Sequence, residues 1–251
     1  MTKLRDVRRC RRAGLLMLGL APFGAGCAGA HEAQPPEHSA GSEGHGARAH
    51  GGEAHGEGHQ HRFEDPAAYA AAWESPERDA WQQPAQLVAT LGIVPGMRVA
   101  DIGTGTGYLL RYLSEATGPE GRVYAIDVER AMVDWVTERA RTSGWTNVTP
   151  VLAPYDGPGV APASLDRAIM VNVWHHIEAR DVYARNLREA LAPGGAVLVV
   201  ETRLDAPEGP PLHYRLPPEQ VMAELRAADF DVALSPYANS RQYAVLATRP
   251  R

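Results

Sequence analysis

Apolar positions fall into short runs and helical spacings that begin near residue 63 and alternate from there on. Short apolar runs between turn residues are typical of buried strands, and spacings of three and four residues are typical of amphipathic helices. The runs predict strands at 98–102, 122–127, 148–153, 165–171, 196–201, 230–235 and 242–248. The spacings predict helices at about 66–74, 77–91, 108–117, 132–140, 179–192 and 217–228.

Helix ends carry signals of their own. Asp65-Pro66 and Ser75-Pro76 each place a capping side chain before a proline suited to a first helical turn. Pro84 is expected to break or restart the second helix. Gly194-Gly195 is expected to end the helix at 179–192 as a C-cap.

Alternating strands and helices predict the fold class. An α/β domain with a doubly wound, mainly parallel sheet and helices on both faces is the expected architecture. The last two strands are close enough in sequence to pair antiparallel. We expect this domain to occupy residues 63–251.

Residues 1–27 have the layout of a bacterial secretory signal, in which a basic stretch to Arg12 precedes an apolar stretch at 13–21. Ala25-Gly26-Cys27 resembles a lipobox, where the cysteine becomes acylated, although Gly24 stands where leucine is usual. We expect a cell-envelope protein, lipid-anchored through Cys27 or secreted. A twin-arginine signal is a weaker fit. A start codon further along, leaving the protein in the cytoplasm, is the remaining alternative.

Residues 28–62 hold seven of the ten histidines, among Gly, Ala, Glu, Ser and Pro. Little in this composition can be buried, so it predicts a disordered His-rich linker. Imidazoles beside glutamates could bind zinc, nickel or copper loosely. Because no fixed ligand spacing occurs, we expect labile binding at most and no defined metal site.

Charge and cysteine content narrow the function further. The formal net charge is −5, and residues 27–251 alone hold 19 basic against 29 acidic side chains. Such an acidic surface gives no footprint for nucleic acid or anionic lipid. Both cysteines, Cys10 and Cys27, lie near the N-terminus, which excludes thiolate zinc sites and cysteine nucleophiles from the domain. No apolar run approaches the ~20 residues of a membrane-spanning helix.

A glycine-rich turn follows the first predicted strand. Gly103, Gly105 and Gly107 are each two residues apart, where the backbone must turn tightly and let a ligand approach. Asp127 ends the next strand, twenty residues beyond Gly107, where a carboxylate can accept hydrogen bonds from both ribose hydroxyls. Together these features predict an adenosine-type ligand at the carboxyl edge of the sheet.

Two features decide which adenosine ligand is expected. A dinucleotide fingerprint requires glycine at position 108, which is tyrosine here. Asp101 lies two residues before the first glycine, where a carboxylate would repel a pyrophosphate but accept a hydrogen bond from an ammonium. S-adenosylmethionine has an ammonium and a sulfonium and no phosphate, so it is the expected cofactor.

The chain resembles class I S-adenosylmethionine-dependent methyltransferases over residues 85–202. The matching stretches are residues 91–107, 123–127, 164–166 and 191–195. The resemblance implies a seven-stranded sheet whose last strand is antiparallel. It also implies that Asp101, Gly103, Gly105 and Gly107 line the methionine side and that Asp127 holds the ribose. We add Thr104, Val128 and Asn172 to the expected cofactor-binding residues.

One departure from the family concerns adenine. Many members carry an aspartate after the third strand, and Pro154 stands there in this chain, with Asp156 two residues later. Adenine recognition is therefore expected from backbone groups or from Asp156.

The second group of candidates follows the fourth strand, in Asn172-Val-Trp-His-His176. His175 or His176 could deprotonate a nucleophile before methyl transfer, and both are our candidate catalytic residues. The alternatives are a metal held with the help of His213, or a hydrogen bond by which His176 only braces the loop. Trp73, Trp81 and Trp174 could wall an apolar substrate pocket or pack in the core.

The predicted function is methyl transfer to a small-molecule acceptor. Its pocket must come from residues 63–84, 172–178 and 203–216, and the last of these is proline-rich and suits a partly rigid lid. An export signal conflicts with a cofactor made in the cytoplasm. Two alternatives follow: an exported protein that captures a small ligand without chemistry, and a metal-handling lipoprotein in which the histidine tract works.

Overall fold

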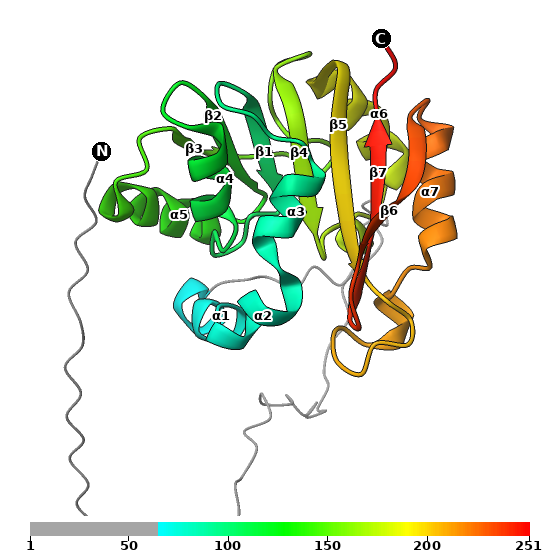
Figure 1. Cartoon of the computed structure of the whole chain (residues 1–251), viewed down its shortest axis with the longest axis horizontal. Coiled ribbons are helices and arrows are strands. Elements are labelled where there is room, and N and C mark those ends of the chain that lie inside the picture. The colour runs from blue at the N-terminus through cyan, green and yellow to red at the C-terminus, as the bar shows by residue number, and fades with distance from the viewer. Residues whose placement is uncertain (1–64) are drawn as a thin grey trace, which may run out of the picture. The chain divides into compact units, whose positions relative to one another are not determined.

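Seven strands form one sheet in the order β3-β2-β1-β4-β5-β7-β6 (Figure 1). The computed structural model describes residues 65–251. The strands are β1 (Arg98–Ile102), β2 (Arg122–Asp127), β3 (Val148–Leu152), β4 (Leu165–Val171), β5 (Leu191–Thr202), β6 (Asp231–Ala238) and β7 (Gln242–Thr248). β1 to β5 pair in parallel, and β7 is antiparallel to both of its neighbours. The mainly parallel seven-stranded sheet with an antiparallel last strand is confirmed. The predicted signal at 1–27 and linker at 28–62 lie outside the described residues.

Helices cover both faces of this sheet. They are α1 (Pro66–Trp73), α2 (Pro76–Gln82), α3 (Pro84–Thr90), α4 (Leu110–Thr117), α5 (Arg130–Ser143), α6 (Arg180–Ala190) and α7 (Pro218–Ala227). Two short 3₁₀ turns, η1 (Trp174–His176) and η2 (Leu212–Tyr214), lie in the loops after β4 and β5. α6 and α7 pack on one face, and α3, α4 and α5 contribute to the core on the other. No helix within residues 65–251 is long and apolar enough to cross a membrane.

The domain has two hydrophobic cores, one on each face of the sheet. The residues of a strand contribute to them alternately, because successive side chains point to opposite faces of a sheet. In β1, Val99 joins the core under α3 and α4, while Ala100 and Ile102 join the core under α6 and α7. All three side chains are almost fully buried. A strand buried on both faces reads as a continuous apolar run, which is why β1 was predictable from so short a segment.

Two helix-end predictions are wrong. α6 ends at Ala190 and not at Gly194-Gly195, because Leu191 already has extended backbone and pairs with Leu165 at the start of β4. β5 therefore begins five residues earlier than predicted. Ser75 makes no capping hydrogen bond at the start of α2, whereas Asp65 does accept one from the Ala68 amide (3.1 Å) at the start of α1.

Helices α1 and α2 form a small unit of their own beyond the ends to which β1 and β4 run (Figure 1). The predicted break at Pro84 is confirmed, since Gln83 adopts a left-handed backbone (φ 49°) between α2 and α3. Because ligands of open α/β sheets bind outside the carboxyl ends of the strands, this helix pair lies over the expected site.

Candidate functional site

The glycine turn connects β1 to α4 and has left-handed backbone at each glycine, with φ of 66°, 53° and 85° at 103, 105 and 107. Such angles are costly for residues with a Cβ. A Cβ on Gly103 would also lie 2.4 Å from Cγ2 of Val173, and one on Gly105 would lie 3.2 Å from the Trp73 ring. The glycines thus let two other segments, the loop after β4 and helix α1, contact the turn.

Asp101 lies at the end of β1 and is buried, with 4% of its surface exposed. Its carboxylate accepts one hydrogen bond, from the Thr104 hydroxyl (2.8 Å). Burial raises the pKa of Asp101 to about 7; the Thr104 bond lowers it, Asp127 raises it and Arg78 lowers it. A buried carboxylate with a single hydrogen bond can accept more, and a cationic group would relieve the cost of its burial.

Asp127 ends β2, next to β1, and is 7% exposed. It accepts hydrogen bonds from the backbone amides of Gly105 (2.9 Å) and Glu129 (3.0 Å). Burial raises its pKa, and bonds from the amides of Glu129, Gly105 and Val128 oppose that rise. The structure therefore brings the two predicted carboxylates and the glycine turn together.

Asn172 follows β4 with a left-handed backbone (φ 56°). It belongs to a relay of hydrogen-bonded amide side chains that also contains Gln242 and Gln82. Its Oδ1 accepts hydrogen bonds from the Thr202 hydroxyl (3.1 Å) and from Nε2 of Gln242 (3.2 Å). Gln242 in turn accepts one from Nε2 of Gln82 (2.9 Å), whose Oε1 accepts one from Nε of Arg78 (2.6 Å). Because Arg78 can only donate hydrogen bonds, it fixes which end of each side-chain amide in the relay donates and which accepts.

This relay was not predicted from the sequence. Gln82 and Gln242 are completely or almost completely buried, yet 160 positions separate them along the chain. Glutamine is usually exposed, and its burial leaves no local pattern. The hydroxyl of Tyr237 on β6 also donates to the backbone oxygen of Gln82 (2.8 Å), so the C-terminal hairpin holds α2 at two points.

His175 is held by Glu201, a carboxylate that no sequence pattern indicates. Nδ1 of His175 lies 2.7 Å from Oε2 of Glu201 at the end of β5, and the two side chains are 3% and 1% exposed. The His175 amide donates to the same carboxylate (3.3 Å). The rings of His175 and His176 lie 4.1 Å apart between centroids. The contact with Glu201 gives His175 a bracing role, whereas the bracing alternative concerned His176.

Trp174 does not wall a pocket. It is fully buried, donates from Nε1 to Glu224 (2.7 Å) and packs edge-on against Tyr183 (6.2 Å between ring centroids). Its role is in the core beneath the loop. Trp73, by contrast, lies over Gly105, at the turn itself.

Ion pairs and hydrogen bonds fasten α1 and α2 to the turn. Arg139 of α5 donates to Glu74 (2.7 Å) at the end of α1 and to the backbone oxygen of Thr106 (2.8 Å) inside the turn. The carboxylate of Asp79 on α2 accepts hydrogen bonds from three side chains: Tyr108, Arg111 and Tyr112. Helices α1 and α2, which form a cover over the glycine turn, are therefore connected to it in one assembly.

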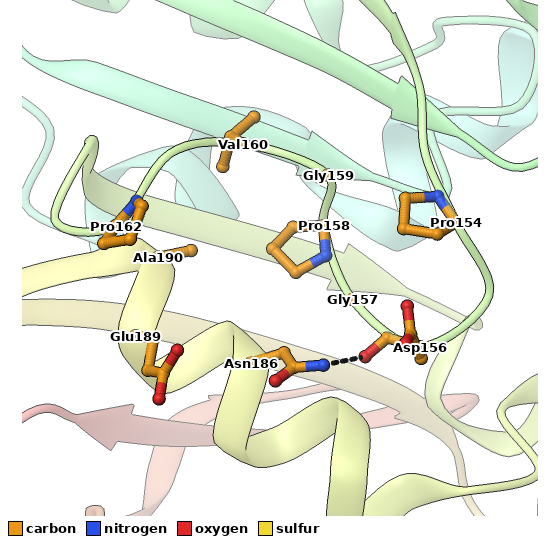
Figure 2. A pocket seen from close by; sticks show the side chains of 10 residues that line it. All are labelled: Pro154, Asp156, Gly157, Pro158, Gly159, Val160, Pro162, Asn186, Glu189 and Ala190. Atoms are coloured by element: carbon orange, nitrogen blue, oxygen red, sulfur yellow. Dashed lines mark hydrogen bonds between the residues drawn. The ribbon is translucent and has the colours of Figure 1, made fainter.

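Two cavities lie in the described part of the chain. One of about 340 Å³ lies between α1–α2 and the helices α4 and α5, lined by Glu74, Ser75, Pro76, Asp79, Tyr108, Arg111 and Arg139. Figure 2 shows the other, of about 210 Å³, under the loop between β3 and β4. Pro154 and Asp156 lie at its rim, and the Asp156 backbone oxygen accepts a hydrogen bond from Asn186 (2.7 Å). Neither cavity is lined by Asp101, Asp127 or Asn172.

Metal binding has no visible basis within residues 65–251, where no group of three His, Cys, Asp or Glu side chains could hold an ion. His213 lies in η2 and stacks on Tyr214. The metal alternative for His175 and His176 therefore lacks a third ligand in the described part of the chain.

Comparisons with known proteins agree with this architecture. A family model described as a methyltransferase domain matches residues 99–195. A solved S-adenosylmethionine-dependent methyltransferase from Aquifex aeolicus superposes with a TM-score of 0.69 and 25% identity, covering 73% of this chain and 98% of that one.

Curated relatives match over shorter stretches. A protein-L-isoaspartate O-methyltransferase of Methanothermobacter thermautotrophicus is 33% identical over 67 residues, which is 27% of this chain and 31% of the relative. The ubiquinone/menaquinone biosynthesis C-methyltransferase UbiE of Burkholderia multivorans is 29% identical over 123 residues, 49% of either chain. The chain thus spans less than half the length of these relatives.

Proposed function

We propose that this chain is an S-adenosylmethionine-dependent methyltransferase acting on a small-molecule acceptor. One observation carries the proposal: buried Asp101 and Asp127 end neighbouring parallel strands and flank a left-handed glycine turn. The match of residues 99–195 to a methyltransferase domain and the superposition on the Aquifex enzyme support it.

The residues present fit this cofactor. Asp127 is a buried acceptor beside the turn and suits the ribose hydroxyls, and Asp101 suits the ammonium of the methionine end. Thr104 orients Asp101, the Val128 amide supports Asp127, and Asn172 borders the same edge of the sheet. When bound, S-adenosylmethionine supplies a methyl group on a sulfonium that is already activated for transfer.

The chain's own contribution is to hold and orient. An activated methyl donor needs little acid–base help, and alignment of the reacting atoms supplies much of the catalysis. Helix α1 covers the turn with Trp73, which keeps water from this part of the site. The side chain of His175 is almost fully buried and bound to Glu201, so its first role is to fix the loop after β4. Proton removal by His175 or His176 remains the alternative for these residues.

The acceptor is a small molecule in this proposal. Residues 27–251 carry ten more acidic than basic side chains, which disfavours nucleic acid. The pocket would form between α1–α2, the loop after β4 and residues 203–216. Arg215 braces this last segment by donating to the backbone oxygens of Pro210 (2.7 Å) and Ala206 (2.8 Å), which suits a fixed wall. One relative is named for protein L-isoaspartate and another for ubiquinone/menaquinone biosynthesis, so their names do not indicate which acceptor this chain methylates.

Location is a separate part of the proposal. The signal-like residues 1–27 support export to the cell envelope, with lipid attachment at Cys27 or secretion. Loose metal binding by the histidine tract would accompany that location.

Titration calorimetry with S-adenosylhomocysteine tests the proposed activity class. We expect saturable one-site binding, with nicotinamide adenine dinucleotide giving none. Absence of S-adenosylhomocysteine binding, or preferential binding of the dinucleotide, would overturn the proposal.

A further inference from the structure

Two charged groups of opposite sign approach the glycine turn without pairing with each other. Asp101 reaches it from β1, and Arg78 reaches it from α2. The charge of each affects the pKa of the other, as the attraction of nearby opposite charges requires. Among residues 65–251, no carboxylate lies within ion-pair distance of Arg78.

Arg78 is held rigidly by three contacts. Its guanidinium stacks 3.8 Å from the centre of the Tyr108 ring, directly after the turn. Nε donates to Gln82 (2.6 Å) and Nη1 donates to the backbone oxygen of Trp73 (2.7 Å). A guanidinium has five N–H groups, so Nη2 and one N–H of Nη1 keep their capacity to donate.

The acidic residues next to Arg78 do not accept hydrogen bonds from its remaining N–H groups, because they are bound to other side chains. Asp79, the next residue on α2, accepts hydrogen bonds from Tyr108, Arg111 and Tyr112. Glu74 is engaged by Arg139. Within residues 65–251, the Asp101 carboxylate accepts a hydrogen bond only from Thr104. A partly buried guanidinium and a buried carboxylate thus lie beside one turn, each with unused hydrogen-bonding capacity. Removing such charges from water is costly when they have no partner of opposite charge.

We propose that Arg78 and Asp101 form one site for a zwitterion, the amino-acid end of the methyl donor. Asp101 accepts a hydrogen bond from the α-ammonium, and Arg78 donates to the α-carboxylate. The planar guanidinium matches a carboxylate better than a lysine ammonium does. The inference rests on the proposed function and adds the residue from α2 that recognises the donor's carboxylate.

Three ligands separate the parts of this contact. S-adenosylhomocysteine carries both charged groups, its decarboxylated analogue keeps only the amine, and 5′-methylthioadenosine lacks both. Calorimetric titrations at about pH 8, where Asp101 is mostly ionised, compare wild type with Arg78→Met. The matched control is Arg185→Met, which removes an exposed guanidinium from α6 that is paired with Asp181.

Arg78→Met should weaken S-adenosylhomocysteine at least tenfold, because a charge-assisted contact is lost. The affinities for the decarboxylated analogue and for 5′-methylthioadenosine should stay within about twofold of wild type, as should every affinity of the Arg185→Met control. The wild-type preference for S-adenosylhomocysteine over its decarboxylated analogue should disappear in Arg78→Met.

Other outcomes overturn the inference. Equal loss of all three ligands would mean that Arg78 only holds Trp73 and Tyr108 in place. Unchanged S-adenosylhomocysteine affinity would mean that it touches no carboxylate. If Arg78→Met fails to fold, wild type still decides, since equal affinity for S-adenosylhomocysteine and its decarboxylated analogue refutes the contact. A wild type that binds no S-adenosylhomocysteine at all contradicts the proposed function instead.

Discussion

Asp101 and Asp127 are both carboxylates at strand ends, but their surroundings stabilise the charged form to different degrees. Asp127 accepts backbone amides from two loops, whereas Asp101 has one hydroxyl. Hydrogen bonds to the ionised form offset the cost of burial. The protein itself therefore stabilises the charged form of Asp127 more than that of Asp101.

Replacing Asp127 tests the ribose assignment at the level of one residue. Asp127→Ala should weaken S-adenosylhomocysteine by about 1–3 kcal/mol, the range for losing hydrogen bonds to a charged group. Calorimetry measures this loss, with Asp134→Ala as a control at an exposed carboxylate on α5. Equal affinities of Asp127→Ala and wild type would remove Asp127 from the ribose site.

Protonation of Asp101 makes ligand affinity depend on pH. Burial raises the pKa of Asp101 to about 7 in the free protein, with Thr104 and Arg78 lowering it and Asp127 raising it. Because the ligand's ammonium needs the ionised carboxylate, S-adenosylhomocysteine should bind more tightly as the pH rises from about 6 to about 8. Asp101→Asn should bind more weakly and show no such rise. A parallel rise in both proteins would assign the titration to another group.

The raised pKa of Asp101 also makes the stability of the fold depend on pH, in the direction opposite to that of ligand affinity. A carboxyl group with a raised folded-state pKa stabilises the fold below its unfolded pKa and loses that contribution as the pH rises through about 7. Ligand binding should therefore improve over the pH range in which the free protein loses stability.

At the scale of elements, most helices and strands follow from local pattern. Both proline-led starts and all seven strands were predictable, because apolar runs and proline act within a few residues. The end of α6 was not, since Leu191 is drawn into pairing with β4 instead of continuing to Gly194-Gly195. Tertiary pairing overrides a local signal there.

The site divides in the same way. Asp101, Asp127 and the glycines could be identified from their spacing around two strands. Gln82, Gln242 and Glu201 could not, because their partners lie far away in the sequence and polar residues are usually exposed.

Removing Gln82 tests how helix α2 is docked. Gln82→Ala would remove the hydrogen bond that Oε1 of Gln242 accepts and the one that Nε of Arg78 donates, and an unsatisfied buried group costs about 1–3 kcal/mol. Thermal unfolding should show a lower Tm, and hydrogen exchange should show faster exchange in α1 and α2. Gln86→Ala, at an exposed position of α3, is the control. Unchanged exchange in α1 and α2 would mean that the relay does not hold the cover.

At the scale of the whole molecule, the core residues of the described part all lie between Leu87 and Ala247. Deleting residues 28–62, whose composition offers little to bury, should leave Tm and S-adenosylhomocysteine affinity unchanged. A full-length chain measured in the same buffer is the reference. A large fall in Tm would make the histidine tract part of the folded domain.

Anchoring belongs to the same scale. Cys27→Ser should abolish lipid labelling and release the protein from the membrane fraction, because an acylated cysteine needs its thiol. Cys10→Ser is the matched control and should leave both unchanged. A Cys27→Ser protein that stays in the membrane fraction would point to an uncleaved signal or another anchor.

The bond between Gln82 and Gln242 also sets an order of events during protein synthesis. The two glutamines are separated by 160 positions, and ribosomes add about 5–20 residues per second. Helix α2 therefore waits roughly 8 to 32 seconds for the partner that seats it. Once residue 127 has been added, the nascent chain contains the glycine turn and both aspartates but lacks the hydrogen bonds that Gln242 and Tyr237 make with helix α2. The proposed binding site is thus completed only after β7 has been made, so we expect ligand binding to begin only near the end of translation.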